Sequence, residues 1–451
     1  MVDTASLFTT LAQSVAPEIA RTLRQLVGTA PDASLNRINP LRFAEEHGFS
    51  ERDSIAAFLH GTRLGLFELG WNLLCRSCAG TLHAGASLRE IDQAQYTCTF
   101  CALDTEPTLD ESIEVTFTVS PRVRRIAAHD PDSLPLWDYA RQIYWSSAMD
   151  LPEGLAPLMG DAILDAVELP ALNSTKRRVS LPQGTVIVFD PVSHAGQFIE
   201  VDSKPADQPQ ELAVGLNDAH LQRAPVALHA GPLDLVLENT TSHRTLPIVW
   251  SAGDSLMELM GRRLPFLTAK RLLTHQTFRD IYRTDVLDID QRFKITSLTF
   301  LFTDLKSSTE LYEKIGDLAA YDLVRAHFRA LTGIVAEEGG AIVKTIGDAV
   351  MATFPTPRQG LTAALRMRAA IEDLNRHNSR DDLRLKIGLH EGPCLAVTLN
   401  ERQDYFGQTV NIAARLQSLA QSRTILTTDA VVGDVDVRSL LGEKALKPSA
   451  G

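Results

Sequence analysis

The fold of the last third of this chain is decided by the stretch AIVKTIGDAVMATF, residues 341–354. Two runs rich in apolar and β-branched residues flank Gly347-Asp348, a dipeptide typical of the turn between paired strands. Taken alone, the stretch predicts a β-hairpin in which Asp348 is an ordinary turn residue.

The segments on either side of this hairpin predict a regular order of elements. A strand over 298–303 and a helix over 308–338 come before it, and a helix over 359–375 and a strand over 383–389 follow it. Together they give the order βαββαβ, which is typical of a ferredoxin-like domain.

Two acidic residues, Asp304 and Asp348, each come directly after an apolar strand. If the first and second strands are neighbours in the sheet, the two carboxylates meet at one edge. With the oxygens of a triphosphate they would form a hard oxygen site suited to Mg²⁺ or Mn²⁺. Ser307, Ser308 and Thr309 open the next helix, whose free N–H groups can hold phosphate. The alternative is structural: an isolated strand-end Asp is a turn residue, and a Ser/Thr run is a helix cap.

Four motifs in this region resemble the class III adenylate/guanylate cyclase homology domain, over about residues 296–448. They are FTDLKSST (302–309), VKTIGDAVMA (343–352), IGLHEGP (387–393) and DYFGQTVNIAAR (404–415). The resemblance implies that Asp304, Asp348 and the carbonyl of Leu305 bind two Mg²⁺ or Mn²⁺ ions. It also implies that Lys344 and Asp404 read the purine, that Asn411 positions the ribose, and that Arg415 stabilises the transition state.

The chemistry of these residue types agrees with those roles. Adenine offers an acceptor at N1 and a donor at N6, which match the Lys344 ammonium and the Asp404 carboxylate. ATP is therefore the expected substrate and cyclic AMP the expected product, with a guanylate cyclase as the alternative. Asn411 and Arg415 are four residues apart and share one face of a helix.

The family resemblance also implies a head-to-tail homodimer, because the family's sites take metal ligands from one subunit and the Asn/Arg pair from the other. A late family lysine that binds phosphates corresponds to Lys447 in the segment ALKP (445–448). A catalytically weak, nucleotide-binding signalling protein is the second alternative.

Four of the five cysteines form two Cys-x-x-Cys pairs, Cys75 with Cys78 and Cys98 with Cys101. Two such pairs at this separation predict four thiolate ligands for a structural zinc ion, as in a zinc ribbon. The alternatives are reduced, partly buried cysteines or a redox pair. The fifth cysteine, Cys394, is expected in the core.

The whole chain is expected to be an α+β multidomain protein. We predict a helical region over 1–70, a zinc-ribbon-like module over 71–106, a β-rich antiparallel sandwich or barrel over 110–252, a helical linker over 253–295 and the cyclase domain over 296–451. Within these regions we expect a helix that Ser50 caps at its start, a helix near 136–147 and a helix over 267–282. The N-terminal regions are expected to regulate the enzyme in response to a ligand or protein that the sequence does not identify.

Composition limits the other functional classes. A formal net charge of −12 argues against a broad basic surface, so binding of nucleic acid by a metal-stabilised transcription factor is the disfavoured alternative. The sequence contains no apolar run of membrane-spanning length and no secretory start. We therefore expect a soluble, cytoplasmic protein.

Overall fold

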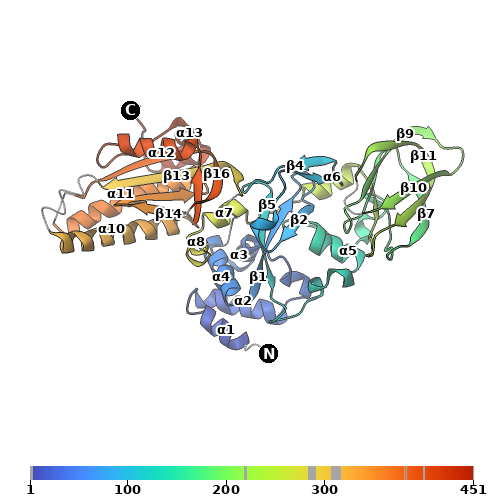
Figure 1. Cartoon of the computed structure of the whole chain (residues 1–451), viewed down its shortest axis with the longest axis horizontal. Helices are drawn as coiled ribbons and strands as arrows, with labels where there is room; N and C mark the ends of the chain where they lie inside the picture. Colours follow the sequence, from blue (N-terminus) through green and yellow to red (C-terminus); the bar gives the residue numbers. More distant parts are fainter. Residues whose placement is uncertain are drawn as a thin grey trace. The chain divides into compact units, whose positions relative to one another are not determined.

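The structure is a computed structural model that describes residues 4–217, 221–282, 291–305, 316–379, 381, 383–399 and 402–449. It divides into two compact units (Figure 1). Unit 1 comprises residues 1–86, 93–107 and 112–267, and unit 2 comprises residues 87–92, 108–111 and 268–451. None of the helices among the described residues combines the length and the apolar character that a membrane crossing requires.

Unit 1 begins with four helices packed on a small sheet. They are α1 (Thr4–Leu11), α2 (Pro17–Thr29), α3 (Pro40–His47) and α4 (Glu51–Arg63), and the sheet has the order β2-β1-β5 from β1 (Phe67–Leu74), β2 (Thr81–Gly85) and β5 (Ile113–Val119). The Ser50 side chain accepts from the backbone N–H of Asp53, which confirms the predicted start of α4. The ring of Phe58 on α4 lies 5.1 Å from that of Phe67 and 5.0 Å from that of Phe117, so aromatic packing joins helix and sheet.

The β-rich part of unit 1 is a seven-stranded sheet of order β10-β11-β9-β8-β12-β6, in which β7 also pairs with β11. Its strands are β6 (Ile163–Ala166), β7 (Ser174–Leu181), β8 (Gly184–Phe189), β9 (Gly196–Pro205), β10 (Gln210–Leu216), β11 (Leu221–Asn239) and β12 (Ile248–Ser251). The prediction of a purely antiparallel arrangement was wrong, because β11 runs parallel to both β9 and β10. Alternating apolar residues reveal a strand but not the direction of its partner.

Short elements link these parts of unit 1. The predicted helix near 136–147 is shorter than expected: α5 (Leu136–Tyr139) passes into a π-helical turn over Ala140–Tyr144. The hairpin of β3 (Tyr96–Cys98) and β4 (Leu103–Thr105) carries the second cysteine pair, and α6 (Asp254–Gly261) follows the large sheet.

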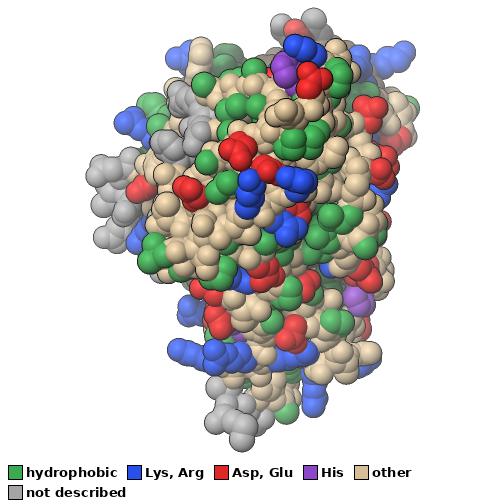
Figure 2. Space-filling view, turned by 90° about the vertical axis from the view of Figure 1, so that its right-hand side faces the viewer, with side chains coloured by type: hydrophobic (Ala, Val, Ile, Leu, Met, Phe, Trp, Pro, Cys, Tyr) green, Lys and Arg blue, Asp and Glu red, His purple; other side chains and the backbone are tan. Residues whose placement is uncertain are grey.

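Ion pairs join strands of the large sheet. Arg178 on β7 makes two hydrogen bonds to Asp234 on β11, and the neighbouring Arg177 makes two to Asp165. Figure 2 views the molecule from the side on which these strands lie in Figure 1, and acidic and basic side chains are interspersed on that face.

Unit 2 is built around a sheet of order β14-β15-β13-β16-β17, to which β18 is added on β16. Its strands are β13 (Phe293–Leu305), β14 (Ala341–Ile346), β15 (Ala349–Phe354), β16 (Leu385–Leu399), β17 (Arg402–Phe406) and β18 (Ile425–Thr427). The helices are α10 (Asp317–Glu337), α11 (Pro357–His377), α12 (Gln408–Leu419), α13 (Asp429–Val432) and α14 (Val435–Glu443). The predicted helix over 308–338 is thus described from Asp317 onward.

Successive residues of β16 show how helices cover both faces of this sheet. A Cβ added at Gly388 would meet the Ala413 carbonyl of α12 at 2.5 Å, whereas the Leu389 side chain packs in the core with α11. Because neighbouring residues of a strand point to opposite faces, α11 and α12 lie on opposite sides of the sheet. Gly388 lets α12 approach the strand backbone directly.

The predicted helix over 267–282 is interrupted. It consists of α7 (Ala269–Leu273) and α8 (Gln276–Ile281), both in unit 2. Between them the Thr274 hydroxyl donates to the carbonyls of Lys270 and Arg271, a local bond that competes with the regular helical ladder.

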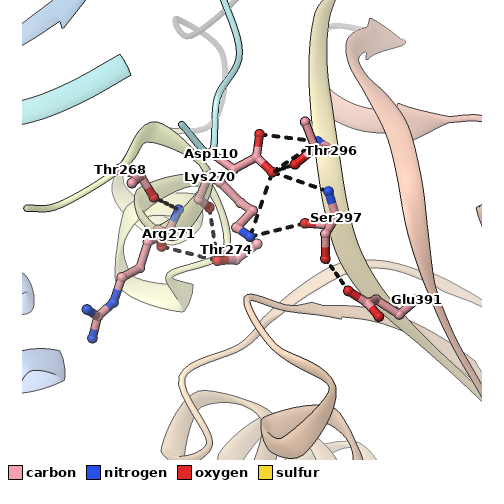
Figure 3. Close-up of polar contacts among 8 residues, drawn as sticks. All are labelled: Asp110, Thr268, Lys270, Arg271, Thr274, Thr296, Ser297 and Glu391. Atoms are coloured by element: carbon pink, nitrogen blue, oxygen red, sulfur yellow. Dashed lines mark hydrogen bonds and ion pairs between the residues drawn. The ribbon is translucent and has the colours of Figure 1, made fainter. Parts of the chain in front are cut away.

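A polar cluster fixes α7 and the segment 108–111 to the start of the sheet (Figure 3). Residues 296 and 297 form a bulge in β13, so their N–H groups are not paired with β16. The Asp110 carboxylate, only 4% exposed, accepts from both N–H groups, and the Lys270 ammonium donates to the Ser297 carbonyl at 3.1 Å. The Ser297 hydroxyl in turn donates to Glu391 on β16.

Candidate active site and cysteine cluster

The two predicted metal-binding carboxylates lie near one another, although the first and second strands are not neighbours in the sheet. The first strand, β13, pairs with the third, β15, and not with the second, β14. Asp304 lies near the end of β13, and Asp348 lies in the hairpin turn that leads into β15, so the two still meet. Gly347 has φ of +63°, a left-handed conformation that glycine adopts without strain, and this allows the tight turn.

The electrostatics of this edge favour a cation. Burial, together with the nearby charge of Asp348, raises the pKa of Asp304 above its ordinary value. The Asp348 Oδ2 atom is buried and has no hydrogen-bond partner among the described residues. A buried carboxylate oxygen of this kind beside a second carboxylate suits a divalent metal ion with oxygen ligands. The Leu305 side chain is buried in the core and has no ligand atom, so the predicted metal ligand is its backbone carbonyl.

Three further side chains at this edge were not anticipated from the sequence. Gln417 of α12 hydrogen-bonds to Asp304, and burial lowers the pKa of His327 on α10 to about 4, an effect partly opposed by the charge of Asp348. Lys386 is the cross-strand neighbour of Asp304. The sequence offered a signal only for Lys386, which stands two residues before Gly388 of the motif IGLHEGP.

The predicted purine-reading pair forms a direct contact. The Lys344 ammonium on β14 donates to Asp404 Oδ2 on β17. These strands are at opposite ends of the hydrogen-bonded order β14-β15-β13-β16-β17, so the sheet must curve strongly to bring them together. Asp404 is 8% exposed, whereas the Lys344 side chain is 44% exposed and accessible to a ligand.

The Asn/Arg pair lies on α12 as predicted. Asn411 and Arg415 are both exposed, whereas Ala413 is buried against the sheet. Gln417, the residue bonded to Asp304, is two positions beyond Arg415, which is about 200° around an α-helix. The Asn/Arg face therefore points away from the Asp304 edge of the same chain.

Of the remaining predicted site residues, Ser307, Ser308 and Thr309 lie outside the described residues. Lys447 is exposed in the segment that follows α14.

The four cysteines of the two Cys-x-x-Cys pairs come together in unit 1. Their four Sγ atoms all lie within 4.8 Å of one another, and the Sγ atoms of Cys78 and Cys98 are 3.7 Å apart. Four thiolates at 2.3 Å from a tetrahedral zinc ion would be separated by about 3.8 Å. The arrangement therefore fits a zinc-ribbon-like motif.

Each cysteine pair occupies the same kind of turn. Cys75 follows β1, Cys98 ends β3, and the residue after each second cysteine has a left-handed backbone, with φ of +57° at Ala79 and +55° at Ala102. The backbone N–H of Gly80 donates to Cys78 Sγ at 3.4 Å. Cys394 is buried in unit 2, as expected, and burial raises the pKa of its thiol to about 12.

Comparison with known proteins gives two family matches. Residues 1–280 match a family of unknown function (DUF5939), and residues 291–438 match the adenylate and guanylate cyclase catalytic domain.

Similar curated proteins include adenylate cyclase 2 of Rhizobium meliloti, 34% identical over 135 residues, and an adenylate cyclase of Glutamicibacter nicotianae, 35% identical over 134 residues. The matches cover 27% and 30% of this chain and 37% and 30% of those proteins, so the chain spans about a third of their length. Guanylate cyclase 32E of Drosophila melanogaster is 28% identical over 145 residues, which are 30% of this chain and 12% of that protein.

A solved structure that matches is the adenylyl cyclase CyaB from P. aeruginosa, with 27% identity, 32% of this chain and 84% of that chain covered, and a TM-score of 0.30. Because the first family model spans more than half of the chain, the chain belongs to the DUF5939 family of unknown function, and it carries an adenylate and guanylate cyclase catalytic domain at residues 291–438.

Proposed function

We propose that this protein is an adenylate cyclase that converts ATP to 3′,5′-cyclic AMP and pyrophosphate. The observation that carries the proposal is the Lys344–Asp404 pair on one side of the sheet in a domain that also brings Asp304 and Asp348 together at a strand end. The matched adenylate cyclases agree with it. For the first four strands the sheet order is β16-β13-β15-β14, or 4-1-3-2, which supports a ferredoxin-like arrangement of the domain.

Asp304, Asp348 and the Leu305 carbonyl would hold two Mg²⁺ or Mn²⁺ ions. When bound, such ions lower the pKa of the ribose 3′-hydroxyl and neutralise the charge of the pyrophosphate. The chain's own part is to orient the substrate: the Asn411 amide can position the ribose, and the Arg415 guanidinium can stabilise negative charge on the α-phosphoryl oxygens.

Base selection depends on Lys344 and Asp404. An ammonium that donates to adenine N1 and a carboxylate that accepts from N6 complement adenine, and guanine presents the opposite polarity at N1 and C6. Because the two side chains already contact each other, they are held close together before the base arrives. This preorganisation supports ATP over GTP as the substrate.

The exposed Asn411–Arg415 face supports a homodimer. Since it points away from the Asp304 edge of its own chain, a complete site requires the face of a second copy. Two such sites would form in a head-to-tail pair.

The cysteine cluster supports a structural zinc ion in unit 1. Four sulfur ligands leave no open position for a substrate, which is typical of a structural rather than a catalytic site. Regulation of the cyclase by the DUF5939 region is part of the proposal.

The test is a cyclase assay of the full chain with ATP or GTP and Mg²⁺ or Mn²⁺. We expect cyclic AMP and pyrophosphate from ATP, with a lower kcat/KM for GTP. Variants Lys344→Ala and Asp404→Ala should reduce the preference for ATP. A purified, folded dimer that makes no cyclic product from either nucleotide would refute the cyclase proposal, and a preference for GTP would favour a guanylate cyclase.

A further inference from the structure

Helix α8 lies against the two strands that carry the proposed base-reading pair. The Arg279 Nη2 atom donates to the carbonyl of Gln403 on β17 at 2.9 Å and to the carbonyl of Val343 on β14 at 3.4 Å. These are the residues directly before Asp404 and Lys344. One guanidinium group therefore holds the two peptide units that lead into the pair.

The hydrogen-bonding pattern of the sheet explains why this contact matters. Val343 is an extra residue in β14, because Ile342 pairs with Ala352 and Lys344 pairs with Met351. A bulge of this kind leaves its residue outside the ladder. Nor does a ladder join β14 to β17, which are at opposite ends of the strand order. Among the described residues, the Arg279 side chain bridges β14 and β17 through hydrogen bonds to the backbone of each strand.

A second contact anchors the same helix. Gln276 Oε1 accepts from the backbone N–H of Ile342 at 2.8 Å, so α8 binds β14 at two successive residues. A cavity of about 240 Å³ is lined by residues of α8, β14 and β17, including Arg279, Gln276 and Gln403. Arg279 is half-buried and lines this cavity, so thermal melts of its variants are needed to check that the fold is intact.

We propose that Arg279 is a positioning residue for base recognition: through the Val343 and Gln403 carbonyls it sets the spacing between Lys344 and Asp404. This inference rests on the proposed function of that pair. It also gives α8 a regulatory role, because a shift of the helix would change the spacing without any contact between the helix and the nucleotide. Lys344 has a long, half-exposed side chain, so fixing its backbone reduces the freedom that must be lost when the base binds.

The test compares Arg279→Ala and Arg279→Lys with the wild type in the full chain. We expect Arg279→Ala to lower kcat/KM for ATP by about tenfold, mainly through KM, and to reduce the ATP-to-GTP preference. Arg279→Lys should recover part of this loss, since the ammonium can reach a carbonyl. The matched control is Arg376→Ala, which removes a 77% exposed arginine from α11 and should leave both values unchanged.

A double-mutant cycle separates positioning from general stability. If Arg279 acts through Lys344, Arg279→Ala should have little further effect on KM in a Lys344→Ala background. Additive losses, equal losses for ATP and GTP, or a wild-type KM in Arg279→Ala would overturn the inference.

Calorimetric measurement of ATP binding distinguishes the positioning role of Arg279 from the proposed cyclase activity. A wild-type enzyme that prefers ATP, with Arg279→Ala indistinguishable from it, refutes the positioning role and leaves the proposed function standing. Weaker ATP binding by Arg279→Ala in a protein that makes no cyclic product supports the positioning role and refutes the cyclase activity.

Discussion

The negative charge of Asp304 destabilises the folded protein when no metal ion is bound. Burial and the neighbouring Asp348 raise the pKa of its carboxyl, so the folded chain favours the neutral form more than the unfolded chain does. The ionised form is the one that binds a divalent cation. The proposed metal-binding role and the stability of the fold therefore make opposite demands on this residue.

Replacing Asp304 with Asn should separate the two demands. Activity should fall about 100-fold or more, because a metal ligand is lost. The metal-free variant should melt at a higher temperature than the wild type at pH 7, where the wild-type carboxylate is ionised. As the pH falls through the raised pKa towards the ordinary value of 3.8, the wild type regains this stability and the difference should disappear.

Thermal melts of both proteins with EDTA, from pH 3.5 to pH 8, measure this difference. A matched substitution at an exposed acid, Asp373→Asn on α11, should show no comparable stabilisation. A metal-free Asp304→Asn variant that is less stable than the wild type at pH 7 would contradict the prediction.

At the scale of elements, the cluster around Asp110 holds the first strand of the catalytic sheet. Asp110→Ala would leave the N–H groups of Thr296 and Ser297 without their acceptor and remove the charge 4.0 Å from the Lys270 ammonium. Loss of a buried, charged acceptor of this kind should lower the free energy of unfolding of unit 2 by about 2 kcal/mol.

Hydrogen exchange of the full chain should locate that loss. We expect faster exchange at Thr296 and Ser297 and in the adjoining part of β13 in Asp110→Ala. Asp381→Ala, which removes a 71% exposed carboxylate from the same unit, serves as the control. Unchanged protection of β13 in Asp110→Ala would show that the cluster does not stabilise the strand.

Helix α12 carries side chains that face in two different directions. Because Gln417 faces Asp304 while Asn411 and Arg415 face outward, Asp304→Ala and Arg415→Ala damage different halves of a shared site. Each variant alone should be inactive. An equal mixture that exchanges subunits should recover about one quarter of wild-type activity, since half of the dimers are mixed and each has one intact site.

Activity of the mixture is compared with that of each variant after exchange of subunits, and light scattering confirms the dimer. The absence of any recovery in exchanged dimers would argue against sites shared between subunits.

At the scale of the whole molecule, the cysteine cluster ties together parts of unit 1 that are far apart in sequence. The sulfurs pack in one core with Tyr144, Trp145 and Trp250. We expect about one zinc ion per chain, and we expect Cys75→Ser to lose the ion and lower the melting temperature of unit 1 by about 5–10 °C.

Elemental analysis and thermal melts check this prediction. Cys394→Ser is the matched control, because Cys394 is a buried cysteine in unit 2 and outside the cluster. A purified wild-type chain that holds no zinc after refolding with excess zinc would contradict the assignment.

Local sequence patterns could predict the identity of the elements. Gly347-Asp348 between two β runs is the observed turn, Ser50 is the observed cap of α4, and the spacing of four residues places Asn411 and Arg415 on one helix face. The two Cys-x-x-Cys pairs likewise come together as four neighbouring sulfurs. Turns, caps and helix faces depend on neighbours within a few residues, so the chemistry of those residues is enough to specify them.

Contacts that depend on how strands align could not be predicted. The sequence did not reveal that β13 pairs with β15, that β11 runs parallel to its neighbours, or that Arg279 bridges β14 and β17. By itself the sequence determined which residues are the candidates for the site's chemistry, because side-chain type and local spacing specify that. Only the tertiary structure decided which backbones hold those residues in place, because strand order, bulges and sheet curvature arise from contacts between distant segments.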